Sequence, residues 1–462
     1  MRASTRVVVL FVSCCVSIPT FGQAIGLPAA GVPLAKAEYA QLPPINISTL
    51  PAGYSANGLT IDAVTGKVIS GGSGTATITA NRNAATEPGG TGSFDVGDTR
   101  SNLPTIDGLN TLATFDGAFV AEAGSSVDQD FRFTMIGNDP KLGGTTIYPA
   151  NIDEVSLQLL NADGSVFKTV SYSPFEQRTL GSPNFVPLNY RSGHGIEYAD
   201  AAHRAEFFNT MKNNWHTLII PQVVNRVTIT VPFFVNVQLS NGSIVQARSY
   251  FTGPAADGST FVLLLSPLFN FFFDNEVVNE INLGNFTTNS VNMTLFPNTF
   301  LFSLNTSNPN MPGSCCTLGF HTYFLEGGVF PQPRWVTEYA SWISPGVFGG
   351  GFQDVTALSH ETGESVDDPF IDNPTPSWQF PGQPANSTDC QGNLEVGDPV
   401  EVLANATAAI EVKRNGTSQI YHPQNLALYQ WFEMGSTSNA IDGAFSFPDE
   451  TVLPISAIPC PK

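Results

Sequence analysis

The sequence predicts an α+β protein that is mainly β, with a β-rich N-terminal part and a C-terminal α+β module. Only 13% of the residues are charged, whereas the chain holds 42 Gly and 34 Pro, a balance typical of β-rich folds with many turns. Short alternating runs bounded by turn residues recur along the chain, and few segments have helical periodicity. A length of 462 residues is enough for two or three domains, each with its own core.

The chain divides into four predicted regions. A leader typical of secretion comes first, followed by a stretch rich in Gly, Ala and Thr that we expect to be a small β module or a loosely ordered segment. Beyond it we expect a β-rich domain with one helix, and then a C-terminal module that carries a metal site. The four regions are residues 1–24, 25–130, 131–300 and 301–462.

The leader has the three parts of a secretion signal. Arg2 and Arg6 are basic, an apolar stretch too short to span a membrane follows, and Gly22 and Ala24 are small residues suited to cleavage. Cleavage after Ala24 removes two Arg and no acid, so the net charge falls from −20 to −22. Such a charge opposes binding to nucleic acid or anionic lipid. We therefore expect a secreted or periplasmic protein whose mature chain has no transmembrane segment.

Periodicity and turn residues predict several elements along the chain. Hairpins are expected to turn at Asp163-Gly164 and at Asn241-Gly242, between runs of alternating apolar residues. Helices are expected over Ala201–Met211 and Pro423–Met434, the second with proline in its first turn. The apolar run Phe261–Phe273 is interpreted as two buried strands, because Ser-Pro interrupts it.

A short motif, H-E-T-G-E, is the strongest sign of chemistry in the sequence. On a helix, His360 and Glu364 lie one turn apart on the same face, where both can bind one metal ion, and Glu361 stands beside them. This is the layout of the zincin H-E-x-x-H helix with its last ligand changed to Glu, so the C-terminal module is expected to carry a zincin-like helix. The helix should end before Pro369, because proline disfavours helix in the residue before it.

Four cysteines remain after the leader: Cys315, Cys316, Cys390 and Cys460. In an oxidising compartment an even number favours disulfides, and neighbouring cysteines rarely bond to each other. We therefore expect at least one bridge from the Cys315-Cys316 pair to Cys390 or Cys460. A zinc-thiolate site is the alternative, although the C-x-x-C spacing is missing.

Four short elements stand out in the last third of the chain: Cys315-Cys316-Thr317-Leu318-Gly319-Phe320-His321, Ser359-His360-Glu361-Thr362-Gly363-Glu364, Asp368-Pro369 and Leu394-Glu395-Val396-Gly397-Asp398-Pro399. Together they resemble a family of secreted bacterial proteins, many from acidobacteria, over Ser314–Met434 and more weakly over Phe131–Ile219. Phe320 stands where that family has Tyr. The chain is also distantly similar to plant phosphate-induced, EXORDIUM-type extracellular proteins, which carry a His-Glu-x-x-Glu helix. The resemblance implies a site and no particular reaction.

Zinc-dependent hydrolysis needs three protein ligands, an open position for water and a base. His360 and Glu364 are expected to supply two ligands, and Glu361 is the candidate catalytic base. The resemblance makes Glu395 and Asp398 the leading candidates for the third ligand, because they recur as a pair in the similar families, and His321 is the next.

Two other interpretations of these acids stay open. The first is a structural calcium ion, which prefers the oxygen ligands that the acids between Glu364 and Asp398 supply, whereas the imidazole of His360 favours zinc or another transition ion. The second is an acidic helix end exposed to solvent, with His360 hydrogen-bonded in a core.

Other polar and aromatic residues carry weaker signals. Four further histidines have no metal-ligand spacing and are expected to be ordinary polar residues; they are His194, His203, His216 and His422. Aromatic residues flank the motif and are interpreted either as core or as the lining of a cleft for peptide or polysaccharide. They are Trp335, Tyr339, Trp342 and Trp378.

Two functions are consistent with these signals. The first is a secreted, zinc-dependent, metallopeptidase-like hydrolase that acts on extracellular peptide. The second is a non-enzymatic cell-surface or extracellular protein, with a binding or structural role, in which the same residues hold a structural ion or none.

The leader leads to a first test. We expect the exported chain to begin at Ile25, because the signal features place cleavage after Ala24. Intact-mass measurement of the exported protein checks this start. A lipid-modified N-terminus at Cys14 would contradict it.

Overall fold

A computed structural model describes residues 60–63, 68–70, 84–85, 112–121, 129–326, 333–348, 351–384, 387, 390–414 and 417–460. The leader and most of the predicted second region lie outside the described residues. Where the chain is described, strands hold far more residues than helices, which confirms the α+β, mainly β class. No helix among the described residues is long and apolar enough to cross a membrane.

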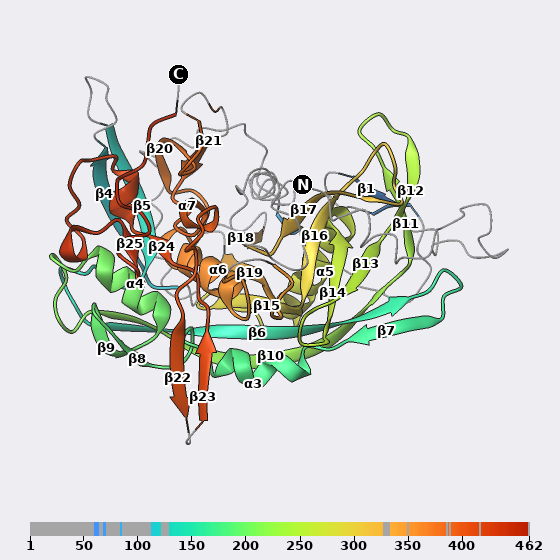
Figure 1. Ribbon diagram of the computed structural model, residues 1–462, viewed down its shortest axis with the longest axis horizontal. Helices are drawn as coiled ribbons and strands as arrows, with labels where there is room; N and C mark the ends of the chain where they lie inside the picture. The colour runs from blue at the N-terminus through green and yellow to red at the C-terminus, as the bar shows by residue number, and fades with distance from the viewer. Residues whose placement is uncertain are drawn as a thin grey trace.

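A seven-stranded sheet forms the centre of the fold, and its two longest strands run across the molecule in Figure 1. Its order is β10-β6-β15-β19-β18-β3, with β7 also paired to β6. Strands β10, β6, β15 and β19 are mutually parallel, and β18 is antiparallel to β19. The bounds are β3 (Ala84–Ala85), β6 (Thr145–Leu160), β7 (Val166–Val170), β10 (His216–Val231), β15 (Val291–Pro297), β18 (Gly319–Glu326) and β19 (Arg334–Trp342).

Two four-stranded sheets and five strand pairs complete the described β structure. The four-stranded sheets have the orders β13-β14-β16-β17 and β12-β11-β1-β2. Their strands are β1 (Thr60–Asp62), β2 (Val68–Ser70), β11 (Phe234–Gln238), β12 (Ile244–Arg248), β13 (Tyr250–Pro254), β14 (Thr260–Leu265), β16 (Thr299–Leu304) and β17 (Pro312–Thr317). The pairs are β4 (Thr114–Ala121) with β5 (Gln129–Ile136), β8 (Leu188–Tyr190) with β9 (Gly193–Ile196), β20 (Pro374–Gln379) with β21 (Cys390–Asn393), β22 (Ile410–Arg414) with β23 (Thr417–Tyr421), and β24 (Leu426–Ala427) with β25 (Ser446–Phe447).

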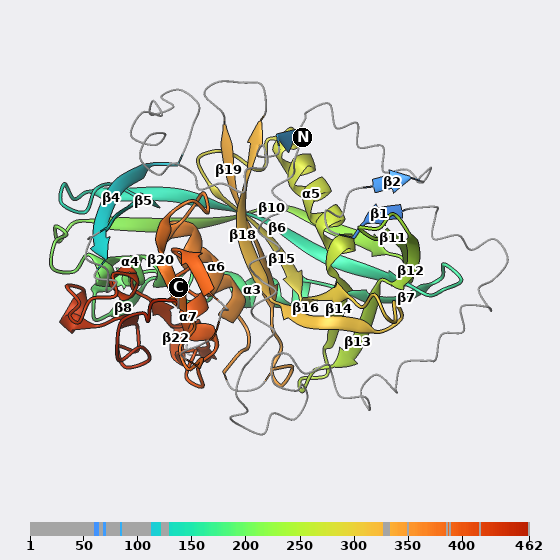
Figure 2. The ribbon, with the colours of Figure 1, turned by 90° about the horizontal axis from the view of Figure 1, so that it is seen from above.

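Helices α5 and α6 cover opposite faces of the β18-β19 pair, an arrangement that Figure 2 shows from above. Side chains alternate between the faces of a strand. Phe320 and Tyr339 therefore point to one face, where they pack against Phe269 of α5. His321 and Glu338, which lie opposite each other in the pair, point to the other face. The helices are α3 (Ser173–Leu180), α4 (Tyr198–Glu206), α5 (Ser266–Leu283), α6 (Thr356–Asp367), α7 (Asp398–Glu401), α8 (Tyr429–Phe432) and the 3-10 turn η3 (Ile441–Gly443).

The predicted boundary at residue 300 falls inside the central sheet. Strand β15 precedes it and β19 follows it, and the two pair along their lengths, from Val291 opposite Val336 to Pro297 opposite Trp342. The site-bearing segments of the C-terminal region therefore stand on a sheet that the preceding region also builds.

Both predicted hairpins are confirmed: β6 pairs with β7 around Asp163-Gly164, and β11 pairs with β12 around Asn241-Gly242. Three other elements differ from expectation. The helix expected over Ala201–Met211 is α4, which begins at Tyr198 and ends at Glu206. Only the first half of Phe261–Phe273 is a strand, because Pro267 lies in the first turn of α5 and starts that helix. The predicted helix over Pro423–Met434 shrinks to α8, because the segment before it forms β24 and pairs with β25.

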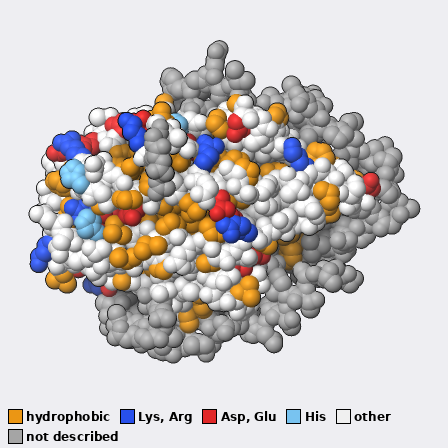
Figure 3. Space-filling view, turned by 90° about the horizontal axis from the view of Figure 1, so that it is seen from below, with side chains coloured by type: hydrophobic (Ala, Val, Ile, Leu, Met, Phe, Trp, Pro, Cys, Tyr) orange, Lys and Arg blue, Asp and Glu red, His pale blue; other side chains and the backbone are white. Residues whose placement is uncertain are grey.

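The surface of one side of the molecule is mixed in charge. In the view from below in Figure 3, acidic and basic side chains of the described residues are scattered among polar and apolar ones. Many carboxylates are instead buried, so part of the excess of acidic over basic residues lies inside the molecule and not on its surface. The buried acids are Asp153, Glu154, Asp200, Glu206, Glu280, Glu338, Asp354, Glu361, Glu364, Asp367, Asp368, Glu395 and Asp398.

The cysteine pairing differs from the prediction. Cys315 is bonded to Cys316, and Cys390 is bonded to Cys460, with the latter two Cα atoms 6.2 Å apart. The backbone explains the second pair, because the Cys460 N–H donates to the carbonyl of Ser377 at 2.9 Å and so holds the C-terminal segment beside β20 and β21. The expected bridge between the two pairs was therefore wrong.

The two disulfides should contribute very differently to stability. The Cys390–Cys460 bridge spans a sequence separation of 70, so it removes much conformational entropy from the unfolded chain, whereas a bridge between neighbours restrains almost none. Replacing Cys390 and Cys460 together with Ser should lower the free energy of unfolding by about 4 kcal/mol. Denaturant unfolding measures this, with the Cys315→Ser, Cys316→Ser double variant as control. Equal losses in both variants would contradict the expectation.

Candidate metal centre

Helix α6 carries the H-E-x-x-E motif and is buried along its whole length. It begins at Thr356, after Asp354, whose carboxylate accepts from the Val355 and His422 N–H groups, and it ends at Asp367, before Pro369, as expected. Its packing partners include β18, β19 and α4. A helix end exposed to solvent, one of the interpretations of the sequence, is therefore wrong for these acids.

The first group of candidate ligands gathers around His360, and we call it the His360 group: His360, Glu364 and Asp398. Its candidate ligand atoms lie within 4.8 Å of one another. His360 Nε2 is 3.0 Å from Glu364 Oε1 and 3.4 Å from Asp398 Oδ1. Asp398 comes from the first residue of α7, so this group joins α6 to α7.

The second group gathers around His321 of β18, where His321, Glu361 and Glu364 offer ligand atoms within 4.8 Å of one another. Glu395 also approaches His321, and we call these four residues the His321 group. His321 Nδ1 is 3.3 Å from Glu364 Oε2, 3.8 Å from Glu361 Oε2 and 3.9 Å from Glu395 Oε2. All six residues that the sequence singled out thus lie in one of these two groups, and Glu364 belongs to both. Buried His, Glu and Asp side chains at this place could hold a metal ion.

The tautomer of His360 is set by its neighbour Gln424. The Gln424 side-chain N–H donates to the Gly397 carbonyl at 2.6 Å, so its amide oxygen faces His360 Nδ1 at 3.1 Å and must accept from it. Nε2 makes no hydrogen bond although two carboxylates are close, and it is the nitrogen that offers a lone pair to an ion when the ring is neutral. A metal-binding histidine typically donates one ring N–H to an amide or carbonyl oxygen and turns its other nitrogen toward the ion. His360 has this arrangement, with Nε2 facing the carboxylates.

Burial and charge shift the titration of these groups in opposite directions. Burial lowers the pKa of both His321 and His360, but the adjacent carboxylates outweigh it and hold each pKa well above its usual value. Burial raises the pKa of Glu395 and Asp398, and it raises that of Glu361 to about 7. Without an ion, the buried acids of the cluster must share protons to reduce their negative charge. A bound divalent cation would supply the positive charge in place of those protons.

Glycines allow the close approaches around the centre. A Cβ on Gly397 would lie 2.6 Å from the His360 ring, and one on Gly319 would lie 2.5 Å from Glu361 Oε1. Gly363, within the motif, leaves room for Leu426, whose Cδ1 would be 2.6 Å from such a Cβ. The chain therefore passes directly against the candidate ligands on both sides of α6.

Glu338 is a buried acid of the site region that the sequence did not single out. It lies opposite His321 in the β18-β19 pair and accepts from the Thr362 hydroxyl at 3.2 Å. Burial raises its pKa to about 8. The sequence alone could not predict that Glu338 faces α6, because this depends on the register between β18 and β19. The flanking aromatics are buried and pack in the core; they are Trp335, Tyr339, Trp342 and Trp378.

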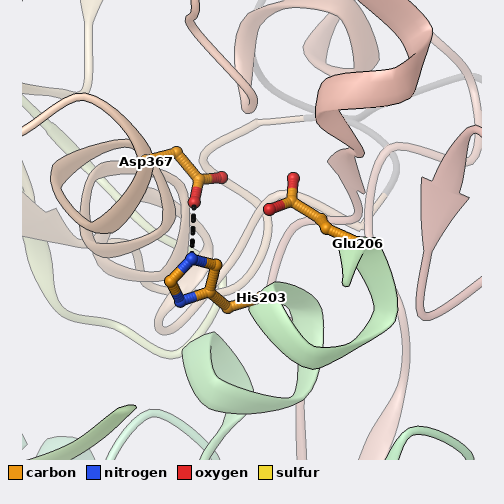
Figure 4. Close-up of side chains that lie close together, drawn as sticks. All are labelled: His203, Glu206 and Asp367. Atoms are coloured by element: carbon orange, nitrogen blue, oxygen red, sulfur yellow. Dashed lines mark ion pairs between the residues drawn. The ribbon is translucent and has the colours of Figure 1, made fainter. Parts of the chain in front are cut away.

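A third cluster joins α4 to the end of α6: His203, Glu206 and Asp367, drawn in Figure 4. His203 Nε2 points toward Asp367 Oδ1 at 3.9 Å. His203, expected to be an ordinary polar residue, thus lies in a buried cluster with two acids, which the H-x-x-E spacing of His203 and Glu206 on α4 brings together with Asp367. Unlike the other two imidazoles, His203 donates to no acceptor, and burial lowers its pKa to about 3. A proton shared by the two acids accounts for this cluster without an ion.

Comparison of the chain with protein-family models, curated proteins and solved structures finds no match. The likeness to secreted bacterial and EXORDIUM-type proteins stays a prediction.

The approach of Gly397 to His360 leads to a test of the geometry. Gly397→Ala should push the His360 ring out of place, because the added Cβ would lie 2.6 Å from it, and should weaken metal binding by at least tenfold. Metal titration by calorimetry measures the affinity. The control is Gly392→Ala on the neighbouring β21, where a Cβ would meet its nearest atom at 3.9 Å. Unchanged affinity in Gly397→Ala would show that His360 binds no ion.

Proposed function

We propose that this protein is a secreted, zinc-dependent, metallopeptidase-like hydrolase whose ion is bound by the His360 group. The observation that carries the proposal is the bare Nε2 of His360, which faces two carboxylate oxygens without a hydrogen bond. Ligand atoms around a tetrahedral zinc ion are about 3.3 Å apart. The distances of 3.0 Å and 3.4 Å from Nε2 to Glu364 and Asp398 agree with that spacing.

Zinc suits this group better than calcium does. An imidazole with two carboxylates is a common ligand set for zinc and other transition ions, whereas calcium prefers six to eight oxygen ligands. In a hydrolase the bound ion supplies a water of lowered pKa and polarises the bond to be cleaved. The protein's own contribution is to orient His360 through Gln424 and to hold Glu364 through the Gly397 N–H, which donates to its Oε1 at 3.1 Å.

The second candidate function is a non-enzymatic extracellular protein with a structural ion. The burial of every ligand favours it, since His360, Glu364 and Asp398 are at most 5% exposed and structural zinc sites are closed to solvent. The two functions share the same ion site and differ in whether water and a peptide or polysaccharide substrate reach it.

Replacing His360 tests both functions. His360→Ala should lose one zinc ion per chain, because it removes a ligand and leaves two buried carboxylates without their cation. If the protein is a hydrolase, turnover of a peptide library should fall by several powers of ten in the same variant. Elemental analysis and library turnover measure the two effects, with His194→Ala, an exposed histidine, as control.

Three outcomes separate the alternatives. Zinc loss together with loss of turnover supports the hydrolase. Zinc in the wild-type protein without turnover of any peptide supports the structural role. Wild-type protein that binds no zinc from buffered solution contradicts the hydrolase and the structural zinc ion, and leaves a non-enzymatic protein without zinc.

A further inference from the structure

We propose that the His321 group binds a second metal ion, so that Glu364 bridges two ions. The inference rests on the proposed function, in that the first ion is the one assigned to the His360 group. The two groups share Glu364, and each adds an imidazole and at least one further carboxylate of its own.

The orientation of His321 carries the first step. Its Nε2 lies 3.2 Å from the backbone carbonyl of Asp368, which can only accept, so Nε2 carries the proton. Nδ1 of the neutral ring then has a free lone pair. This nitrogen is buried and makes no hydrogen bond, and His321 is only 1% exposed. A buried nitrogen without a partner is unfavourable unless an ion or proton satisfies it.

The carboxylates around Nδ1 carry the second step. Three of them approach it to between 3.3 Å and 3.9 Å, from Glu361 and Glu364 on α6 and from Glu395 after β21. Bonds of about 2.1 Å in an octahedral ion place adjacent ligand atoms about 3.0 Å apart. The 3.3 Å from Nδ1 to Glu364 Oε2 is close to that spacing, and the oxygens of Glu361 and Glu395 must draw nearer when an ion binds. Glu361 Oε2 and Glu364 Oε2 also lack hydrogen-bond partners. Nδ1 and the oxygens of Glu361 and Glu364 therefore lie within 4.8 Å of one another, and Glu395 approaches Nδ1 from a third chain segment.

Glu364 itself carries the third step, because its two oxygens face different groups. Oε1 is 3.0 Å from His360 Nε2, and Oε2 is 3.3 Å from His321 Nδ1. Glu364 is fully buried, so neither of its oxygens lies at the protein surface. A carboxylate that offers one oxygen to each side is the geometry of a bridge between two ions.

The second site should take a divalent ion that accepts three oxygen ligands and one nitrogen, such as zinc or manganese. Glu361 is then a ligand, a role that differs from the catalytic base expected from the sequence. Two bridged ions form a centre that can stabilise the attacking and leaving oxygens of a hydrolysis together.

Counting ions in the full chain tests the inference. Wild-type protein loaded with zinc and freed of unbound metal should hold two ions, and both His321→Gln and Glu395→Gln should hold one. Glu361→Gln should also lose an ion, whereas a catalytic base would keep both ions and lose only turnover. His203→Gln is the matched control, since it replaces a buried imidazole that also faces carboxylates but lacks an acceptor for its N–H. It should keep both ions.

The outcomes keep this inference apart from the proposed function. One ion in the wild type, lost in His360→Ala and kept in His321→Gln, would overturn the second site and leave the first intact. One ion lost in both variants would mean a single shared ion and would also overturn it. A second ion lost only in His203→Gln would place it at the third cluster instead. No bound ion would overturn both proposals.

A measurement on the wild-type chain covers the case in which a variant does not fold. Manganese-loaded protein should give an exchange-coupled paramagnetic resonance spectrum, because one carboxylate joins the two ions. The spectrum of isolated manganese ions would overturn the bridge.

Discussion

The burial of carboxylates on α6 is the constraint on which the rest of the site depends. Removing an ionised carboxylate from water costs several kcal/mol unless a cation or hydrogen bonds replace the lost hydration. Helix α6 buries Glu361, Glu364 and Asp367, and His321 and His360 lie beside the first two. The surrounding chain is arranged to supply positive charge or protons to that helix.

Buried carboxylates also occur away from α6, where a proton and not an imidazole offsets the cost of burial. Asp153 on β6 lies near Glu276 and Glu280 of α5, and burial with these neighbours raises its pKa to about 8. Asp153 therefore keeps its proton at neutral pH, and no imidazole is among the causes of its shift. At α6, by contrast, two imidazoles turn bare nitrogens toward the acids. An acid held neutral by a proton needs no such arrangement, and this difference separates the candidate metal centre at α6 from the acids around Asp153.

Local signals in the sequence predicted local structure well. The extent of α6 followed from its motif and from Pro369, and both hairpins followed from their Gly-containing turns. Contacts between segments far apart in the sequence could not be predicted. The disulfide pairing depends on the C-terminal segment returning to β20, and the shortening of the helix near Pro423 depends on β25 pairing with β24. Local helix propensity lost there to a strand partner distant in sequence.

The candidate ligands were predictable because they sit in recognisable motifs, but their grouping was not. His360, Glu364 and Asp367 follow the i, i+4, i+7 spacing that normally marks the apolar stripe of a buried helix. Here that stripe is polar, and the apolar contacts of the helix come from Ala357, Leu358 and Val366 on its other faces. The polar stripe contacts the α7 acid at one end, His321 of β18 in the middle and α4 at the other end. The contacts that hold the polar face of α6 in place therefore include those that form the candidate metal centre.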